Sequence, residues 1–293
     1  MGSGATDSRE LLPELAVLPG HLLWRSAARV HAALAEVLPP GVDLHAYAAL
    51  LALGGGATRS QQELAQTISV SRTTMVKVAS ALAEDGLVER VRSPEDRRSY
   101  ALTRTPAGAA AARRWRRHAD AVEAQVTAGF SDAERDELRA LLGRVAQDEL
   151  SPEVPAPLRE SIGFLVTRVH ARTHREALGA LEPVGVEPRH YATLTALTAT
   201  GPVPQAELAR RLGLSGASMV QIADELEQRG LVERRRPPAD RRVQVLHLQP
   251  GAEDVLDEAG RVVRAQVEQV LATLSPAEVS RVVSLLQRLV TAP

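Results

Sequence analysis

The amino-acid sequence predicts a mainly α-helical protein made of two copies of one unit, each with a small β-hairpin. The first observation is an internal repeat: the segment QQELAQTISVSRTTMVKVASALAEDGLVERVRSPEDRR, starting at Gln61, returns from Gln205 as QAELARRLGLSGASMVQIADELEQRGLVERRRPPADRR. The second is apolar spacing of the helical kind on both sides of a short charged hairpin in each copy. The proline-rich stretch SPEVPAP predicts a semi-rigid linker at 151–157, between a first unit at 1–150 and a second at 158–293.

The first two helices of copy one follow from apolar spacing and helix-stop signals. Apolar residues from Leu23 to Leu34 recur at helical intervals, and the pattern ends at Pro39. A second helix is expected from a cap at Asp43 to the glycines that begin at Gly54.

A pair of helices joined by a tight turn comes next. Ser60 starts a short helix that runs to Thr67, and a longer helix is expected at about 71–85. Its inward face carries Met75, Val78, Ala79 and Leu82. Gly86 then ends the helix at the position where glycine is favoured.

The hairpin and the last two helices complete the copy. Two short strands are expected on either side of a charged tip at 92–98. Thr105 opens a long helix rich in alanine and arginine, and a capping box at 131–134 starts the final one. The second copy repeats that box at 275–278. Helix, turn, helix and a hairpin with a basic tip together form a winged helix-turn-helix.

Composition excludes several classes of protein. The chain has no cysteine, which excludes disulfides, thiolate metal sites and cysteine-based redox sensing. It has no evident catalytic carboxylate pair, nucleophile motif or glycine-rich phosphate loop, so the sequence predicts no enzyme, cofactor or metal. Residues 1–20 do not resemble a signal peptide, and no stretch approaches the roughly 18 apolar residues that cross a bilayer. We therefore expect a cytoplasmic protein without a membrane partner.

The run ELAQTISVSRTTMVKVASALAEDGLVERVRSPEDRRSYALT resembles the MarR family of multiple antibiotic resistance regulators. Its hallmarks are the Leu64-Ala65 helix, the Val70-Ser71 turn, GLVER and the triplet Asp96-Arg97-Arg98. Copy two carries the equivalents Leu208-Ala209, Leu214-Ser215, GLVER and Asp240-Arg241-Arg242. The resemblance implies two winged helix-turn-helix units that share a helical dimerisation layer about a pseudo-twofold axis. One chain would thus be a built-in dimer, and further pairing of fused chains stays open.

The second helix of each pair is the expected reader of DNA, because a helix fits the major groove and its outward side chains reach base edges. The candidates are Arg72, Thr73, Thr74 and Lys77 in copy one, and Ser215, Ser218 and Gln221 in copy two.

The hairpin tips, here called the wings, are the second candidate contact with DNA. A short basic hairpin suits the narrow minor groove and its negative potential. The candidates are Arg92, Asp96, Arg97 and Arg98 in copy one, and Arg235, Arg236, Asp240, Arg241 and Arg242 in copy two. The resemblance implies that Asp96 pairs with one arginine and orients the other. The alternative, a solvated charged hairpin, is weakened because the pattern occurs twice in register.

The two copies are expected to read DNA unequally. The outward face of the reading helix is basic in copy one, at Arg72 and Lys77. Copy two has Gly216 and Gln221 at those positions, and Asp224 adds a negative charge that should repel phosphate. The second wing, however, gains charge, with Arg234, Arg235, Arg236, Arg241 and Arg242. Since phosphate contacts position and base contacts specify, we expect copy two to hold the duplex and copy one to read it.

A candidate ligand pocket rests on four residues of the first helix of each copy, Arg29, His31, Arg172 and His174. By the resemblance, this helix lines an effector site between the dimerisation layer and the DNA-binding lobe. The four side chains suit either a small anionic or aromatic effector or hydrogen bonds within the interface, and the sequence favours neither. His170 and His174 have the spacing of two metal ligands, but no third ligand accompanies them, so surface or interface histidines are the better interpretation.

Two functions fit these observations. The first is a sequence-specific regulator of transcription, a ligand-responsive repressor that binds a pseudo-palindromic operator in double-stranded DNA as one fused chain. The alternative is a winged-helix scaffold for protein interactions with weak or non-specific DNA binding. The weak second reading helix favours the alternative, and the two basic wings oppose it.

Overall fold

The computed structural model describes residues 11–38, 44–92, 100–238 and 242–292, and it confirms the mainly helical architecture with small β-hairpins. The chain divides into two compact units. The first-repeat unit is Ala27–Val169, and the second-repeat unit combines Met1–Ser26 with His170–Pro293. Each unit contains one complete helix-turn-helix and its hairpin.

The compact units do not coincide with the sequence repeats at their ends. Helix α2 (Pro19–Val37) starts in the second-repeat unit, and helix α9 (Ile162–Leu181) starts in the first-repeat unit. The stretch 151–157 contains the start of α8 (Ala156–Arg159) and belongs to the first-repeat unit. A division at 151–157 thus separates the two sequence repeats. The compact units are instead divided within α2 and within α9.

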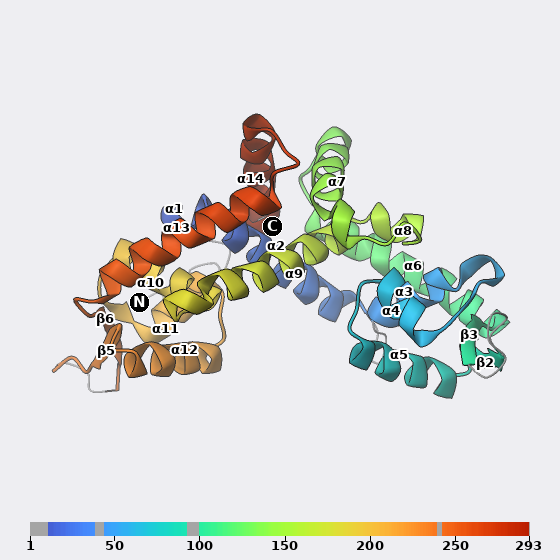
Figure 1. The fold of residues 1–293 in the computed structure, drawn as a ribbon, viewed down its shortest axis with the longest axis horizontal. Coiled ribbons are helices and arrows are strands. Elements are labelled where there is room, and N and C mark those ends of the chain that lie inside the picture. The colour runs from blue at the N-terminus through green and yellow to red at the C-terminus, as the bar shows by residue number, and fades with distance from the viewer. Residues whose placement is uncertain (1–10, 39–43, 93–99, 239–241, 293) are drawn as a thin grey trace, which may run out of the picture. The chain divides into compact units, whose positions relative to one another are not determined.

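The first-repeat unit places a helix-turn-helix and a three-stranded sheet against longer helices (Figure 1). Besides parts of α2 and α9 and the helix α8, its elements are α3 (Leu44–Ala52), η1 (Gly54–Gly56), β1 (Thr58–Arg59), α4 (Gln61–Thr67), α5 (Arg72–Glu84), β2 (Val88–Arg92), β3 (Tyr100–Arg104), α6 (Pro106–Val126), α7 (Asp132–Ala146) and η2 (Gln147–Glu149). The antiparallel sheet has the order β1-β3-β2, with Val88 opposite Arg104.

The second-repeat unit repeats this plan. Besides parts of α2 and α9, its elements are α1 (Pro13–Ala16), η3 (Glu182–Val184), α10 (Pro188–Thr200), β4 (Val203–Pro204), α11 (Gln205–Leu212), α12 (Gly216–Gln228), β5 (Val232–Arg235), β6 (Val245–Leu248), α13 (Ala252–Val270) and α14 (Pro276–Thr291). The antiparallel sheet has the order β4-β6-β5, with Val232 opposite Leu248.

Local capping and apolar spacing explain the helix-turn-helix. Ser60 and Glu63 form a reciprocal capping box at the start of α4, and the Ser71 hydroxyl accepts from the Thr74 N–H at 3.0 Å at the start of α5. The inward residues predicted for α5 are all buried, and Met75 has no exposed surface. They pack on α3, α4 and the hairpin, which fixes the opposite face of α5 toward solvent.

Glu123 of α6 anchors the start of α9 in the first-repeat unit. Its carboxylate accepts from the N–H groups of Ile162 at 2.8 Å and Gly163 at 3.2 Å, and from the Ser161 hydroxyl at 3.0 Å. A carboxylate at a helix N-terminus satisfies unpaired N–H groups and interacts favourably with the helix dipole. The second repeat has Val267 at the position of Glu123, so the sequence repeat did not reveal this contact.

We expect Glu123→Gln to lower the free energy of unfolding of the first-repeat unit by about 1–2 kcal/mol, because charge-assisted bonds to a helix N-terminus are lost. Urea unfolding followed by Trp115 fluorescence, in a Trp24→Phe background, measures this unit alone. The control is Asp120→Asn, which removes a charge from the same helix at a side chain that is 70% exposed. Equal unfolding curves for both variants would contradict the anchoring role.

Candidate nucleic-acid interface

The first recognition helix, α5, presents the predicted reading residues to solvent. Arg72, Thr73 and Lys77 are exposed, and Thr74 is half-buried. Thr74 also shares a 2.8 Å hydrogen bond with the hydroxyl of the N-cap Ser71, so its side chain supports the helix start. Arg72 and Lys77 have no ion-pair partner within the described ranges, which leaves their charge available to a polyanion.

The second recognition helix, α12, exposes Ser215, Ser218 and Gln221, but it ties each of them to the protein. Ser215 is the N-cap, and its hydroxyl accepts from the Ser218 N–H at 3.1 Å and shares a 2.8 Å bond with the Ser218 hydroxyl. The Gln221 amide donates to Glu225 Oε1 at 3.0 Å. The serine contacts repeat those of Ser71 and Thr74 on α5, whereas Gln221, unlike its counterpart Lys77, is held by an acidic neighbour.

Glu225 belongs to a polar cluster that is peculiar to the second repeat. Its Oε2 lies 2.7 Å from Nε2 of the fully buried His190, whose Nδ1 accepts from the Glu187 N–H at 3.0 Å. Burial lowers the pKa of His190, so the ring is neutral and donates from Nε2. The first repeat has Ala46 and Ala81 at the positions of His190 and Glu225. The cluster therefore fixes Glu225, which in turn binds the Gln221 amide, and α5 has no equivalent arrangement beneath Lys77.

Arg234 of β5 pairs with Asp224 of α12. The guanidinium is 2.6 Å from Asp224 Oδ1 and 2.7 Å from Glu227 Oε2, and it donates to the Val220 carbonyl at 3.0 Å. The Arg234 side chain is only 14% exposed. Asp224 is therefore paired with a cation, and that pair joins the wing strand to α12. Its repulsion of phosphate stays a prediction.

Arg90 is the counterpart of Arg234 in the first repeat, and sequence reasoning missed it because it lies inside the strand motif GLVER. The acids that hold Arg234 are replaced by Ser80 and Ala83. Arg90 is exposed and has no acidic partner among the residues that the structure describes. Within the described ranges, Arg90 is thus an additional unpaired cation beside the first recognition helix. A count of wing arginines alone does not include it.

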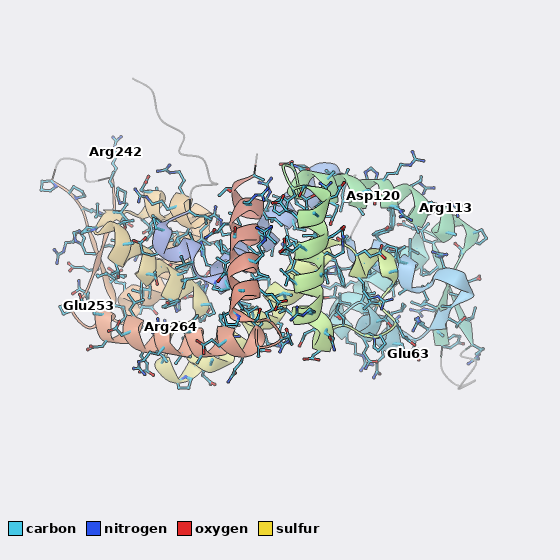
Figure 2. The ribbon with its side chains drawn as sticks, turned by 90° about the horizontal axis from the view of Figure 1, so that it is seen from above. Glu63, Arg113, Asp120, Arg242, Glu253 and Arg264 are labelled. Atoms are coloured by element: carbon cyan, nitrogen blue, oxygen red, sulfur yellow. The ribbon has the colours of Figure 1, made fainter. Side chains whose placement is uncertain are left out.

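The wings are described only in part. Arg92 is exposed at the end of β2, with its guanidinium 4.5 Å from the centre of the Tyr100 ring. Asp96, Arg97, Arg98, Asp240 and Arg241 lie outside the described residues. In the second wing Arg236 and Arg242 are exposed, and Arg242 projects from the ribbon of its unit (Figure 2). Arg235 is 59% exposed but pairs with Glu233 at 2.9 Å, so the second wing carries less free charge than its arginine count indicates.

The first-repeat unit also contains a cavity of about 350 Å³. Its apolar wall includes Val30 and Leu34 of α2 and Phe164 of α9. Its charged lining consists of Arg116, Arg139, Asp120, Glu123 and Glu160. None of Arg29, His31, Arg172 and His174 lines this cavity. Arg172 instead pairs with Glu176 at 2.9 Å, and His170 and His174 have ring centroids 5.7 Å apart.

Comparison with known proteins places the chain in a family. A family model described as MarR family matches residues 41–99 and 184–243, one match in each repeat. A curated relative, a candidate transcriptional regulatory protein for the hcr operon of Thauera aromatica, is 38% identical over 120 residues, which is 41% of this chain and 71% of the relative. The chain belongs to the MarR family. It is therefore assigned to a family of transcription regulators, which is not an enzyme family.

Solved MarR-type proteins are similar to a single repeat of this chain. A MarR family transcriptional regulator from Rhodococcus sp. RHA1 is 28% identical and covers 45% of this chain and 94% of its own, with a TM-score of 0.42. CouR from Rhodococcus jostii RHA1, solved with p-coumaroyl-CoA, is 29% identical, with coverages of 46% and 96% and a TM-score of 0.42. The repressor CouR bound to a 23-mer DNA duplex is 32% identical, with coverages of 39% and 80% and a TM-score of 0.37.

Each MarR repeat also exposes a valine in the middle of its recognition helix, and sequence reasoning missed both because it considered polar side chains only. Val76 is 45% exposed and Val220 is 46% exposed. They occupy the same position in the two repeats. The sequence signal that could have identified them is an apolar residue on the outward face of a helix whose other outward residues are mostly polar.

Two further findings bear on this MarR chain. In the described ranges no helix is long and apolar enough to cross a membrane. Among the same residues, no group of three or more histidine, aspartate or glutamate side chains is arranged to hold a metal ion.

Proposed function

We propose that this chain represses transcription by binding a pseudo-palindromic operator in double-stranded DNA, with one fused chain supplying both recognition helices. The observation that carries the proposal is the duplication itself: α5 and α12 each follow a matched helix and turn, and each exposes its outward face beside a hairpin that bears arginines. A helix of this kind fits the major groove, and a two-headed binder suits two half-sites.

The proposal gives the side chains distinct tasks. Arg72 and Lys77 donate to guanine O6 and N7 or to phosphate, and Arg90 adds a phosphate contact next to them. Val76 and Val220 reach thymine methyl groups, which is the apolar contact available in the major groove. Gln221, Ser215 and Ser218 make the weaker contacts of the second half-site, while the wings enter the minor groove.

Selection of bound duplexes from a random DNA pool tests the specificity, and titration of the selected duplex with light scattering tests the stoichiometry. We expect an enriched motif with two half-sites and one chain per duplex. Recovery of no motif would favour the protein-interaction scaffold, and a requirement for two chains per minimal site would contradict the fused-dimer mode.

The wings should contribute charge-dependent affinity. Arg242→Ala is expected to weaken operator binding by about 1–3 kcal/mol and to reduce the slope of log affinity against log salt by about one, because one phosphate or minor-groove contact is lost. Arg98→Ala tests the equivalent position of the first wing. Affinities measured over a salt series are compared with Arg264→Ala, which removes an exposed charge from α13. Unchanged slopes in both wing variants would leave the wings without this role.

We further propose that an effector binds the 350 Å³ cavity and weakens DNA binding. The apolar wall suits a small aromatic effector, whereas the charged lining, with Asp120, Glu123 and Glu160 beside two arginines, gives no preference for an anion. Binding of a panel of small aromatic compounds, with and without a carboxylate, is measured by Trp115 fluorescence and by release of operator DNA. Ala119→Phe, which fills the cavity lining, should abolish the response, whereas Ala121→Phe, at an exposed position on the same helix, should preserve it. An equal response in both variants would exclude this cavity.

A further inference from the structure

The turn of each helix-turn-helix is held by an arginine from a helix outside it. In the first-repeat unit, Arg168 of α9 donates from Nη1 to the Ser69 carbonyl. In the second-repeat unit, Arg25 of α2 donates from Nη1 to the Arg211 carbonyl at 3.3 Å. The Arg211 carbonyl lies in the last turn of α11, and the Ser69 carbonyl lies just beyond the end of α4. Carbonyl groups there lack helical partners, and a cation interacts favourably with the helix dipole.

Both guanidiniums are largely removed from solvent, and each packs against the turn that it contacts. Arg25 is only 7% exposed, and burial lowers the pKa of both guanidiniums from the ordinary arginine value. Gly213 in the second turn has a φ of +69°, and a Cβ there would lie 3.3 Å from Arg25 Cζ. Ser69, its counterpart, has a φ of +54° and donates from its hydroxyl to the Glu149 carbonyl at 3.0 Å. Each turn thus has a left-handed residue beside its arginine, and in the first turn that residue, Ser69, also supplies the carbonyl acceptor.

The two arginines occupy the same position of the repeat. The segment HLLWRSAARVH at 21–31 matches FLVTRVHARTH at 164–174, with Arg25 opposite Arg168. Yet Arg168 belongs to the second repeat in sequence and contacts the turn of the first, while Arg25 belongs to the first repeat and contacts the turn of the second. Equivalent arginines therefore contact the two turns, at carbonyl groups two positions apart in the repeat, and each arginine is supplied by the other repeat.

We propose that Arg25 and Arg168 are positioning residues for DNA recognition that act crosswise, each fixing the recognition helix of the other repeat. The turn sets the angle between the two helices of the pair, so a side chain that binds its carbonyl groups restricts how α5 or α12 meets the groove. The role in DNA recognition rests on the proposed function, whereas the crosswise control of the turns can be measured without DNA.

Amide hydrogen exchange on the full chain tests the crosswise control. Arg168→Ala should speed exchange at 68–74 by about tenfold and leave 212–218 unchanged, and Arg25→Ala should do the reverse, because loss of a bond to a charged donor costs about this factor. Arg168→Lys and Arg25→Lys, which keep the charge but lose the planar fork, should give smaller changes at the same sites and serve if the alanine variants fail to fold. Arg175→Ala, at an exposed position of α9, is the control. Changes in the turn of an arginine's own repeat, in both turns or in neither would overturn the proposal.

Base-by-base substitution of the selected operator tests the consequence for DNA reading. The half-site read by α5 is identified first, as the one whose sequence preference is lost in Arg72→Ala. Arg168→Lys should then reduce discrimination in that half-site by several-fold, and Arg25→Lys should do so in the other. If the wild-type chain shows no sequence preference, the proposed function fails while hydrogen exchange still decides the crosswise positioning. If it has a preference that neither variant alters, only the role in reading is overturned.

Discussion

Replacing Arg72 and Lys77 together by alanine is expected to lower the affinity for the operator by at least about thirtyfold and to relax the sequence preference of one half-site. Each side chain can make a bond to guanine that is worth about 1–3 kcal/mol, and every 1.4 kcal/mol is a factor of ten. Both residues are exposed and unpaired within the described part of α5, so no internal partner competes for their charge. The preference at the second half-site should survive.

The matched experiment changes the outward face of α12 at Gln221, the counterpart of Lys77, and at Asp224. Gln221→Ala removes a side chain whose amide is already bonded to Glu225, so we expect a loss of less than about tenfold, the scale of one neutral hydrogen bond. Asp224→Ser should have a small effect as well, because it frees Arg234 from only one of its two acidic partners. The measurement is a base-substitution scan of the operator with each variant. Equal sensitivity of both half-sites in all variants would show that shape readout, rather than these side chains, determines the preference.

Acid should destabilise the second-repeat unit through His21, and His21→Phe should remove that sensitivity. Burial, with the nearby positive Arg25, lowers the pKa of His21 from 6.5 to about 3, and Nε2 of its ring has no partner among the described residues. The native state therefore keeps the ring neutral, while the unfolded chain binds a proton as the pH falls below 6.5. The stability contributed by the neutral ring is complete above that pH and decreases on acidification.

The size of this effect follows from proton linkage. With pKa values of 6.5 unfolded and about 3 folded, the contribution of His21 to the free energy of unfolding falls by about 2 kcal/mol between pH 7.5 and pH 5. The repeat itself supplies the replacement: Phe164 occupies the equivalent position and packs under Arg168, with the guanidinium 5.4 Å from the ring centre. His190, which is also buried and has a lowered pKa, adds a loss of the same sign that His21→Phe does not remove.

Urea unfolding followed by Trp24 fluorescence, in a Trp115→Phe background, measures the second-repeat unit across this pH range. The difference in stability between His21→Phe and wild type should grow by about 2 kcal/mol from pH 7.5 to pH 5. His118→Phe, in the other unit, is the control and should leave the Trp24 curve unchanged. Parallel pH profiles for His21→Phe and wild type would contradict the burial of a neutral histidine at this position.

Local sequence signals determined much of the fold. The caps at Ser60, Ser71, Ser131 and Ser275 form as predicted, because each needs only a hydroxyl and an N–H group three residues away. The inward face of α5 and the exposure of Arg72 and Lys77 follow from helical periodicity alone. The repeat and its family also came from sequence, since they depend on residue identity in order along the chain.

Partner choice between distant residues was decided only by the tertiary structure. Arg234 looked like an additional wing charge, yet packing of β5 against α12 places it between Asp224 and Glu227, where charge attraction pairs it. Arg90 has the same place in the repeat and stays unpaired because Ser80 and Ala83 face it instead. The contacts of Glu123 with the start of α9, and of Arg25 and Arg168 with the two turns, join residues separated by 38 or more positions. No local sequence pattern predicts such pairs. The free energy of each contact depends on burial and on the distance between two elements, and both are set only when the chain folds.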